Sequence, residues 1–113
     1  MSSKRLKQQA NKRHAHLFAA LGDQTRLSLV SKLSDGQPRS ITQLADDHKL
    51  TRQAITKHLH VLENAGIVQC IRSGRESIFQ FDAQPLDELQ DYLASVSDQW
   101  DQTLARLKSF VED

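Results

Sequence analysis

The chain has 113 residues and a mass of 12.8 kDa, which is the size of one domain and does not fit a two-domain enzyme. Hydrophobic residues make up 38% of it and charged residues 26%, so we expect a folded protein rather than a disordered one. The single cysteine, Cys70, excludes an intrachain disulfide framework and a cysteine-rich zinc site. The sequence has neither a run of about 18 apolar residues nor an apolar signal core, so we expect a soluble cytoplasmic protein without membrane contact.

The net charge of +1 conceals a division along the chain. Residues 1–75 carry 13 Lys/Arg and 5 Asp/Glu, a balance of +8, whereas residues 76–113 carry 2 Lys/Arg and 9 Asp/Glu, a balance of −7. This pattern indicates that one region faces a polyanion and the other faces water or a basic partner.

Two helices are predicted before residue 35. The first runs from Leu6 to Gly22, a helix-stopping residue, and the second runs from the N-cap Asp23 to Leu33. The middle of the chain then predicts a helix-turn-helix over residues 40–65, with a short helix from Ser40 to about residue 48 and a longer one from the cap Thr51 to about residue 65. Residues 67–81, with a Ser-Gly turn at their centre, predict a β-hairpin, or wing.

A long last helix is predicted from Pro85, because apolar residues then recur every three or four positions as far as Val111. It spans about 26 residues, or ~39 Å, which is more than so small a domain covers. We therefore predict a two-fold homodimer built from residues 1–21 and 85–112, with a typical total buried area on the order of 1,600 Å² and recognition helices ~34 Å apart. The expected interface residues are Leu6, Ala10, Leu17, Leu89, Leu93, Val96, Trp100, Leu104 and Leu107.

The longer helix of the helix-turn-helix has two faces. At about 100° per residue, Ile55, Leu59 and Leu62 form a core stripe, and the polar residues face outward. Glutamine can bond adenine, threonine can meet a thymine methyl, and lysine or arginine can reach guanine or phosphate. The predicted DNA-binding residues, including two arginines at the hairpin tip, are Arg39, Thr51, Arg52, Gln53, Thr56, Lys57, His60, Arg72 and Arg75.

Each of these features also has a purely structural interpretation. Any amphipathic helix has a solvated polar face, and arginine is common at exposed turns. His58 falls at the edge of the core stripe, where we expect a half-buried, hydrogen-bonded side chain. Cys70 is expected to be a small half-buried residue of the first wing strand, although a disulfide between chains or a sulfenic acid switch stays open.

Three segments of the chain are characteristic in their pattern: ALGDQTRLSLVSKL, TRQAITKHLHVLENAGIV and RSGRESIFQF. With them the chain resembles members of the ArsR family of bacterial winged-helix transcriptional repressors, and the similarity extends over about residues 15–112. The resemblance implies a mainly α fold with a small β-hairpin, a winged helix-turn-helix that dimerises through its N- and C-terminal helices. It also implies a homodimer on an inverted-repeat operator in double-stranded DNA, whose binding a metal, a thiol change or another signal often releases. No small-molecule inducer is identified from the sequence.

The chain departs from the metal sensors of that family. The stretch ITQLADDHKL lacks their Cys-x-Cys-type motif, and the last helix has no histidine to join its acidic residues as a zinc or nickel ligand. The ending PLDELQDYLASVSDQWDQTLARLKSFVE resembles a subgroup without a metal site. We therefore expect no metal and no cofactor.

The predicted function is that of a sequence-specific DNA-binding regulator, a repressor that is not a metal sensor. One alternative is a metal- or thiol-responsive repressor with the same fold, and another is a winged-helix module for protein–protein contact. An enzyme is not expected, because the sequence has no catalytic triad order, phosphate-binding loop or dinucleotide glycine pattern.

Overall fold

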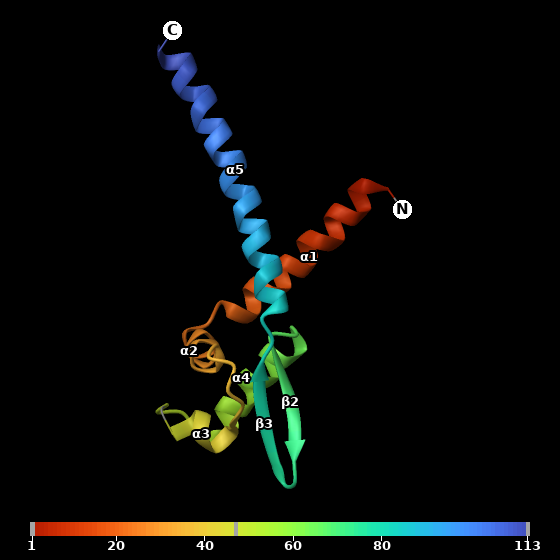
Figure 1. The fold of residues 1–113 in the computed structure, drawn as a ribbon, viewed down its shortest axis with the longest axis vertical. Helices are drawn as coiled ribbons and strands as arrows, with labels where there is room; N and C mark the ends of the chain where they lie inside the picture. The colour runs from red at the N-terminus through yellow and green to blue at the C-terminus, as the bar shows by residue number, and fades with distance from the viewer. Residues whose placement is uncertain (1, 47, 113) are drawn as a thin grey trace.

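The computed structural model describes residues 2–46 and 48–112, so Met1, Asp47 and Asp113 lie outside the described residues. Helices α1 (Ser3–Leu21) and α2 (Gln24–Leu33) come first, followed by strand β1 (Arg39–Ser40) and helix α3 (Ile41–Asp46). Helix α4 (Arg52–Asn64), strands β2 (Val68–Ser73) and β3 (Glu76–Phe81), and helix α5 (Gln84–Glu112) complete the chain (Figure 1).

Local capping sets most of these boundaries. The Asp23 carboxylate accepts the backbone N–H of Arg26 at 3.0 Å, and the Thr51 hydroxyl accepts that of Ala54 at 3.1 Å, so both predicted caps are confirmed. The first helix begins at Ser3 rather than Leu6, because the Ser2 hydroxyl accepts the N–H of Arg5 at 3.3 Å. Helix α4 is followed by Gly66, whose φ of 79° is the left-handed conformation that favours glycine.

The sheet has three strands rather than the two of the predicted hairpin. Its order is β1-β3-β2, and both pairings are antiparallel. Cys70 of β2 and Arg39 of β1 both pair with Phe79 of the central strand. Strand β1 is not predictable from the sequence, because two residues are too few to show the alternation by which strands are recognised. The strand ties the beginning of α3 to the wing.

One apolar core holds α1, α2, α3, α4 and the sheet together. The stripe of Ile55, Leu59 and Leu62 is fully buried, as predicted, so the opposite side of α4 faces outward. Two residues that were expected at a dimer interface are also buried within this chain: Leu17 is 0% exposed and Leu89 is 4% exposed. The ends of α1 and α5 nearest the core pack on their own domain, so these two side chains leave little surface for a second copy.

The terminal helices project from this core. Helix α5 extends away from the helix-turn-helix, and α1 crosses near its base and leaves in another direction (Figure 1). The principal extents are 67 × 36 × 21 Å and the radius of gyration is 18.7 Å, against about 13 Å for a compact domain of this length. The architecture is a mainly α winged helix-turn-helix with two protruding helices.

Among residues 2–46 and 48–112, no helix combines the length and the apolar character that crossing a bilayer requires.

Candidate nucleic-acid interface

The outward face of α4 presents polar side chains next to the sheet. Gln53, Lys57 and His60 are exposed on this face, and their helix is fixed from behind by the buried stripe. The His60 side chain is 60% exposed, and its Nδ1 lies 3.3 Å from the Glu63 carboxylate. These three predicted residues therefore lie on one accessible surface.

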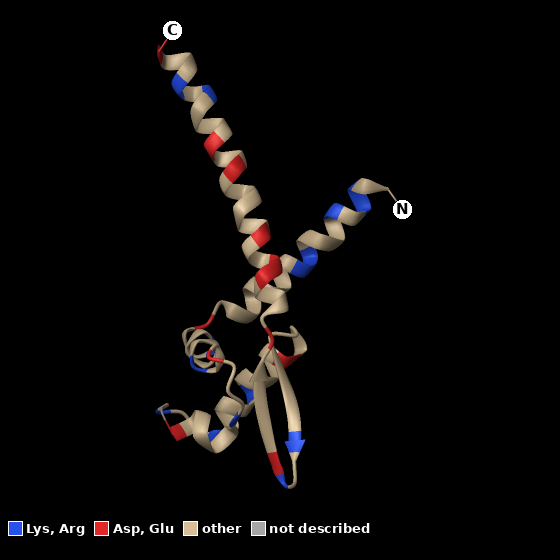
Figure 2. Ribbon diagram, in the orientation of Figure 1, with Lys and Arg blue, Asp and Glu red and all other residues tan. Residues whose placement is uncertain are grey.

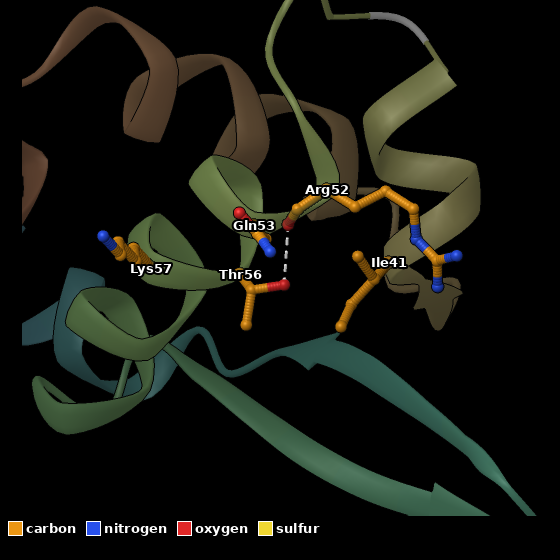
Figure 3. A pocket seen from close by; sticks show the side chains of 5 residues that line it. All are labelled: Ile41, Arg52, Gln53, Thr56 and Lys57. Carbon is orange, nitrogen blue, oxygen red and sulfur yellow. Dashed lines mark hydrogen bonds between the residues drawn. The ribbon is translucent and has the colours of Figure 1, made fainter.

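Two threonine hydroxyls, one at the N-cap of α4 and one within the helix, already have backbone partners. Thr51 caps the helix, and the Thr56 hydroxyl donates to the carbonyl oxygen of Arg52 at 2.7 Å (Figure 3). The Thr56 hydroxyl proton is thus used inside the helix, whereas its oxygen keeps lone-pair capacity and its methyl group needs no partner.

A hollow of ≈ 530 Å³ lies where α3 meets α4. Arg52, Gln53, Thr56 and Lys57 line it from α4, and Ile41 lines it from the beginning of α3 (Figure 3). Ile41 was not among the predicted site residues. An isoleucine in a short helix gives no sign of a binding site, and only the approach of α3 to α4 places Ile41 beside this surface.

A second hollow of ≈ 160 Å³ lies between α3, α4 and the wing. Arg52 of α4 and Arg75 of the hairpin both line it, together with the hydroxyl residues Thr42 and Ser77 and with Glu76. Guanidinium and hydroxyl groups are ligands for phosphate oxygens. Thr42 and Ser77 were not among the predicted site residues, because a threonine in a helix and a serine in a strand carry no distinctive sequence signal.

The wing places positive charge on the side of α4 where that helix begins. Arg72 and Arg75 are exposed, and the tip of the hairpin carries Lys/Arg positions in Figure 2. Gly74, with a φ of 63°, makes the tight turn between the two strands. Several Asp/Glu positions lie along α5, which extends away from the wing (Figure 2).

Arg39 differs from the other predicted DNA-binding residues. Its guanidinium donates to the Lys32 carbonyl at 2.6 Å, to the Gln37 carbonyl at 3.4 Å, and to both carboxylate oxygens of Asp35 at 3.0 and 2.8 Å. The hydrogen bonds from Arg39 are the main reason that the pKa of Asp35 falls from its ordinary 3.8 to about 2. The Arg39 side chain is 21% exposed, so the structure gives it an anchoring role in the α2–β1 connection.

His58 lies on the back of α4 and is half-buried and hydrogen-bonded, as predicted. Its Nδ1 is 3.1 Å from the Arg26 guanidinium and 3.7 Å from the Asp23 carboxylate. The pKa of Asp23 lies below its ordinary value, first because its carboxylate accepts the backbone N–H of Arg26. The same arginine donates through Nε to the Ala20 carbonyl at 2.6 Å, at the end of α1.

Helices α1 and α5 cross through polar and aromatic contacts. Arg13 donates to both Glu88 carboxylate oxygens, at 2.6 and 3.0 Å, and this pairing lowers the pKa of Glu88. One residue further along α1, the His14 ring lies 4.6 Å from that of Tyr92.

Beyond this crossing, α5 carries an uncovered apolar stripe. Its members share one side of the helix and are 41–60% exposed: Leu93, Val96, Trp100, Leu104 and Leu107. Leu6 and Ala10 of α1 are exposed as well.

Within the described residues, no three His, Cys, Asp or Glu side chains are grouped so that they could hold a metal ion. Cys70 is a half-buried free thiol that packs against the core.

The chain is similar to a protein family, to a protein sequence and to a solved structure. The family model for "Bacterial regulatory protein, arsR family" matches residues 23–69. YuzN, an uncharacterized HTH-type transcriptional regulator of Bacillus subtilis (strain 168), is 39% identical over 79 residues, which are 65% of this chain and 86% of that protein. An ArsR-like transcriptional regulator from Rhodococcus sp. RHA1 is 33% identical, with a TM-score of 0.77 over 88% of this chain and 93% of the other.

A more distant structure has the same fold. It is the homodimeric winged helix-turn-helix DNA-binding domain of a possible ArsR-family transcriptional regulator from Mycobacterium bovis, determined in solution. It is 19% identical, and the TM-score is 0.66 over 88% of this chain and 89% of that one.

Proposed function

The chain belongs to the ArsR family of DNA-binding transcriptional regulators, and on that premise we propose that it is a repressor that binds an inverted-repeat operator as a homodimer, without a metal as its signal. The family is one of transcriptional regulators and not of enzymes. The observation that carries the proposal is the surface of α4, where exposed Gln53, Lys57 and His60 stand beside the basic wing while the opposite stripe is buried.

The contacts divide by chemistry. Arg52, Arg72 and Arg75 neutralise phosphates and supply most of the affinity, and Thr42 and Ser77 add hydroxyl donors in the hollow between α3, α4 and the wing. The base edges of the major groove are contacted by four side chains of α4: Gln53, Thr56, Lys57 and His60. Arg39 is left out of this set because its guanidinium already donates to the Asp35 carboxylate and to the backbone carbonyls of Lys32 and Gln37.

The homodimer is supported by the exposed stripe of α5. A helix that projects from the core with Trp100 60% exposed leaves an apolar surface that a second copy would cover. The Mycobacterium bovis relative with this fold is homodimeric. The proposed interface keeps Leu6, Ala10 and the α5 stripe, and omits Leu17 and Leu89. In this arrangement residues 1–21 and 85–112 form the dimerisation part, residues 40–65 the helix-turn-helix and residues 67–81 the wing.

Repression would result from the dimer occupying the DNA of a promoter. Two α4 helices ~34 Å apart occupy successive major grooves on one side of the duplex. A dimer that covers a promoter in this way blocks polymerase.

The proposal of a regulator without a metal signal rests on the ligands that the chain offers. Helix α3 contains no cysteine and α5 contains no histidine. Release of DNA by micromolar zinc, nickel or copper would instead support the metal-responsive alternative, and release by an oxidant that is lost in Cys70→Ser would support the thiol-responsive one.

Selection of bound sequences from a random DNA pool tests the main proposal. We expect an inverted repeat whose half-sites are about one helical turn apart. A salt titration of binding to mixed-sequence DNA separates the regulator from a protein–protein interaction module, because phosphate contacts weaken steeply with salt. Enrichment of a single half-site would contradict the dimer, and failure to bind any duplex at low salt would refute DNA binding.

A further inference from the structure

The hollow between α3 and α4 has an apolar part within a polar surface. Ile41 reaches it from α3 and Thr56 reaches it from α4, whereas Gln53, Lys57 and Arg52 supply the polar lining (Figure 3). Ile41 is half-buried and packs against the core, and the part of it that lines the hollow adds aliphatic carbon to an otherwise polar surface. The hollow therefore suits a ligand that has an apolar group next to hydrogen-bonding groups.

Thr56 contributes its methyl group rather than a hydrogen-bond donor. Its hydroxyl is turned back along α4 and donates to the Arg52 carbonyl at 2.7 Å (Figure 3). A hydroxyl that gives its proton to the helix has none left for an acceptor on a base. Because Ile41 has no polar side-chain atom, the two residues together offer aliphatic carbon.

On the basis of the proposed DNA contact by α4, we infer that this hollow receives the C5-methyl group of one thymine in each half-site. Among the base edges of the major groove, only the thymine edge carries a methyl group in unmodified DNA. Ile41 and Thr56 are thus specificity-determining residues that recognise one base by its methyl group. Gln53, in the same lining, bonds an adenine at an adjoining position.

The test uses the operator obtained by random-pool selection and replaces each thymine of one half-site in turn by deoxyuridine, which removes only the methyl group. We expect binding to weaken about fourfold at one position, the effect of one buried methyl-sized group (~0.8 kcal/mol), and to stay within twofold at the others. The inference is overturned if operator binding persists and no thymine-to-uracil change weakens it. Failure of the proposed function is a separate outcome, since then no operator is selected.

Variants of Thr56 distinguish its methyl group from its hydroxyl. Thr56→Val keeps the methyl and removes the hydroxyl, so the fourfold discrimination between thymine and uracil should remain. Thr56→Ser keeps the hydroxyl and removes the methyl, so the discrimination should fall towards onefold. The reverse result would show that the Thr56 oxygen, and not its methyl group, meets the base, and it would overturn the inference.

Ile41 is tested with a matched isoleucine on the wing. Ile41→Ala should lose the discrimination, whereas Ile71→Ala, at a 46% exposed position of β2 that does not line the hollow, should keep it. Because Ile41 also packs against the core, Ile41→Val serves as a second variant that preserves most of the packing and reduces the discrimination. Discrimination that is unchanged in the folded Ile41 variants and in Thr56→Ser would refute the assignment.

Discussion

The Arg26 guanidinium lies 3.1 Å from Nδ1 of His58, and this contact joins the beginning of α2 to the side of α4 that faces the core. The same guanidinium donates to the Ala20 carbonyl at 2.6 Å and to the Ala19 carbonyl at 3.4 Å, at the end of α1. One side chain therefore spans the helix proposed for dimerisation and the helix proposed for DNA contact. For Nδ1 of His58 to accept from an arginine, it must be the unprotonated nitrogen of the ring.

Removing this connection should destabilise the domain and loosen α4. Arg26→Gln loses charged hydrogen bonds to Ala20 and His58, and a bond to a charged group contributes about 1.5–3 kcal/mol. Urea unfolding should show a loss of that order, and operator affinity should fall even under conditions where the variant is fully folded. Arg106→Gln on exposed α5 is the control, with an expected change within about 0.5 kcal/mol. Equal stability of the two variants would contradict the connecting role of Arg26.

Arg75 should contribute to affinity without regard to sequence. Arg75→Ala removes a phosphate contact, so binding should weaken on operator and mixed-sequence DNA alike, and the slope of log K against log salt should decrease by about one. Fluorescence anisotropy at several salt concentrations measures both quantities. Arg39→Gln is the matched control, because that guanidinium is engaged by Asp35 and by carbonyls. A salt slope that changes for Arg39→Gln and not for Arg75→Ala would reverse our assignment of these two arginines.

Gln53 should contribute to the choice of sequence. Gln53→Ala is expected to cost about 1–3 kcal/mol on the selected operator and to relax the preference at one base step per half-site, while binding to mixed DNA changes little. Competition binding with operators substituted at single positions locates that step. Gln90→Ala, on exposed α5, should behave as the parent protein. A uniform loss of affinity over all sequences would instead identify Gln53 as a phosphate contact.

Trp100 should be a principal residue of the homodimer. Trp100→Ala removes the largest side chain of the exposed stripe, and the truncation of such a residue typically costs at least about 2 kcal/mol. Sedimentation equilibrium should show an increase of the dimer dissociation constant by about 30-fold or more, with the helical circular dichroism retained. Asp98→Ala, two residues away and directed to the opposite side of α5, is the control. Dimerisation as tight as that of the parent would show that the partner lies elsewhere.

The Asp35–Arg39 pair should be sensitive to acid. The folded pKa of Asp35, about 2, lies below its ordinary 3.8, so the contribution of the pair to stability is complete above pH 3.8 and is lost as the pH falls towards 2. A carboxyl-detected NMR titration of Asp35 measures this pKa directly. In Arg39→Gln the principal hydrogen bonds are gone, and the pKa should return towards its ordinary value. A parent protein in which Asp35 already titrates near 3.8 would contradict the pairing.

The sequence by itself determined the elements whose causes are local. Caps act within three residues, a helix face repeats every three or four residues, and glycine supplies the left-handed conformation at Gly66 and Gly74. For this reason the limits of α2 and α4, the buried stripe of α4 and the position of the wing were predictable, and the segments that resemble a known family agree with them.

Only the tertiary structure decided what depends on residues distant in the chain. A two-residue strand exists because β3 offers it hydrogen-bonding partners, and the burial of Leu17 and Leu89 follows from where two long helices touch the core. The approach of α3 to α4 brings Ile41 to the recognition surface, and Asp35 with nearby carbonyls engages Arg39. The physical reason is that helical periodicity predicts on which face of a helix a side chain lies. It does not predict which residues contact that side chain, because those residues come from distant parts of the chain.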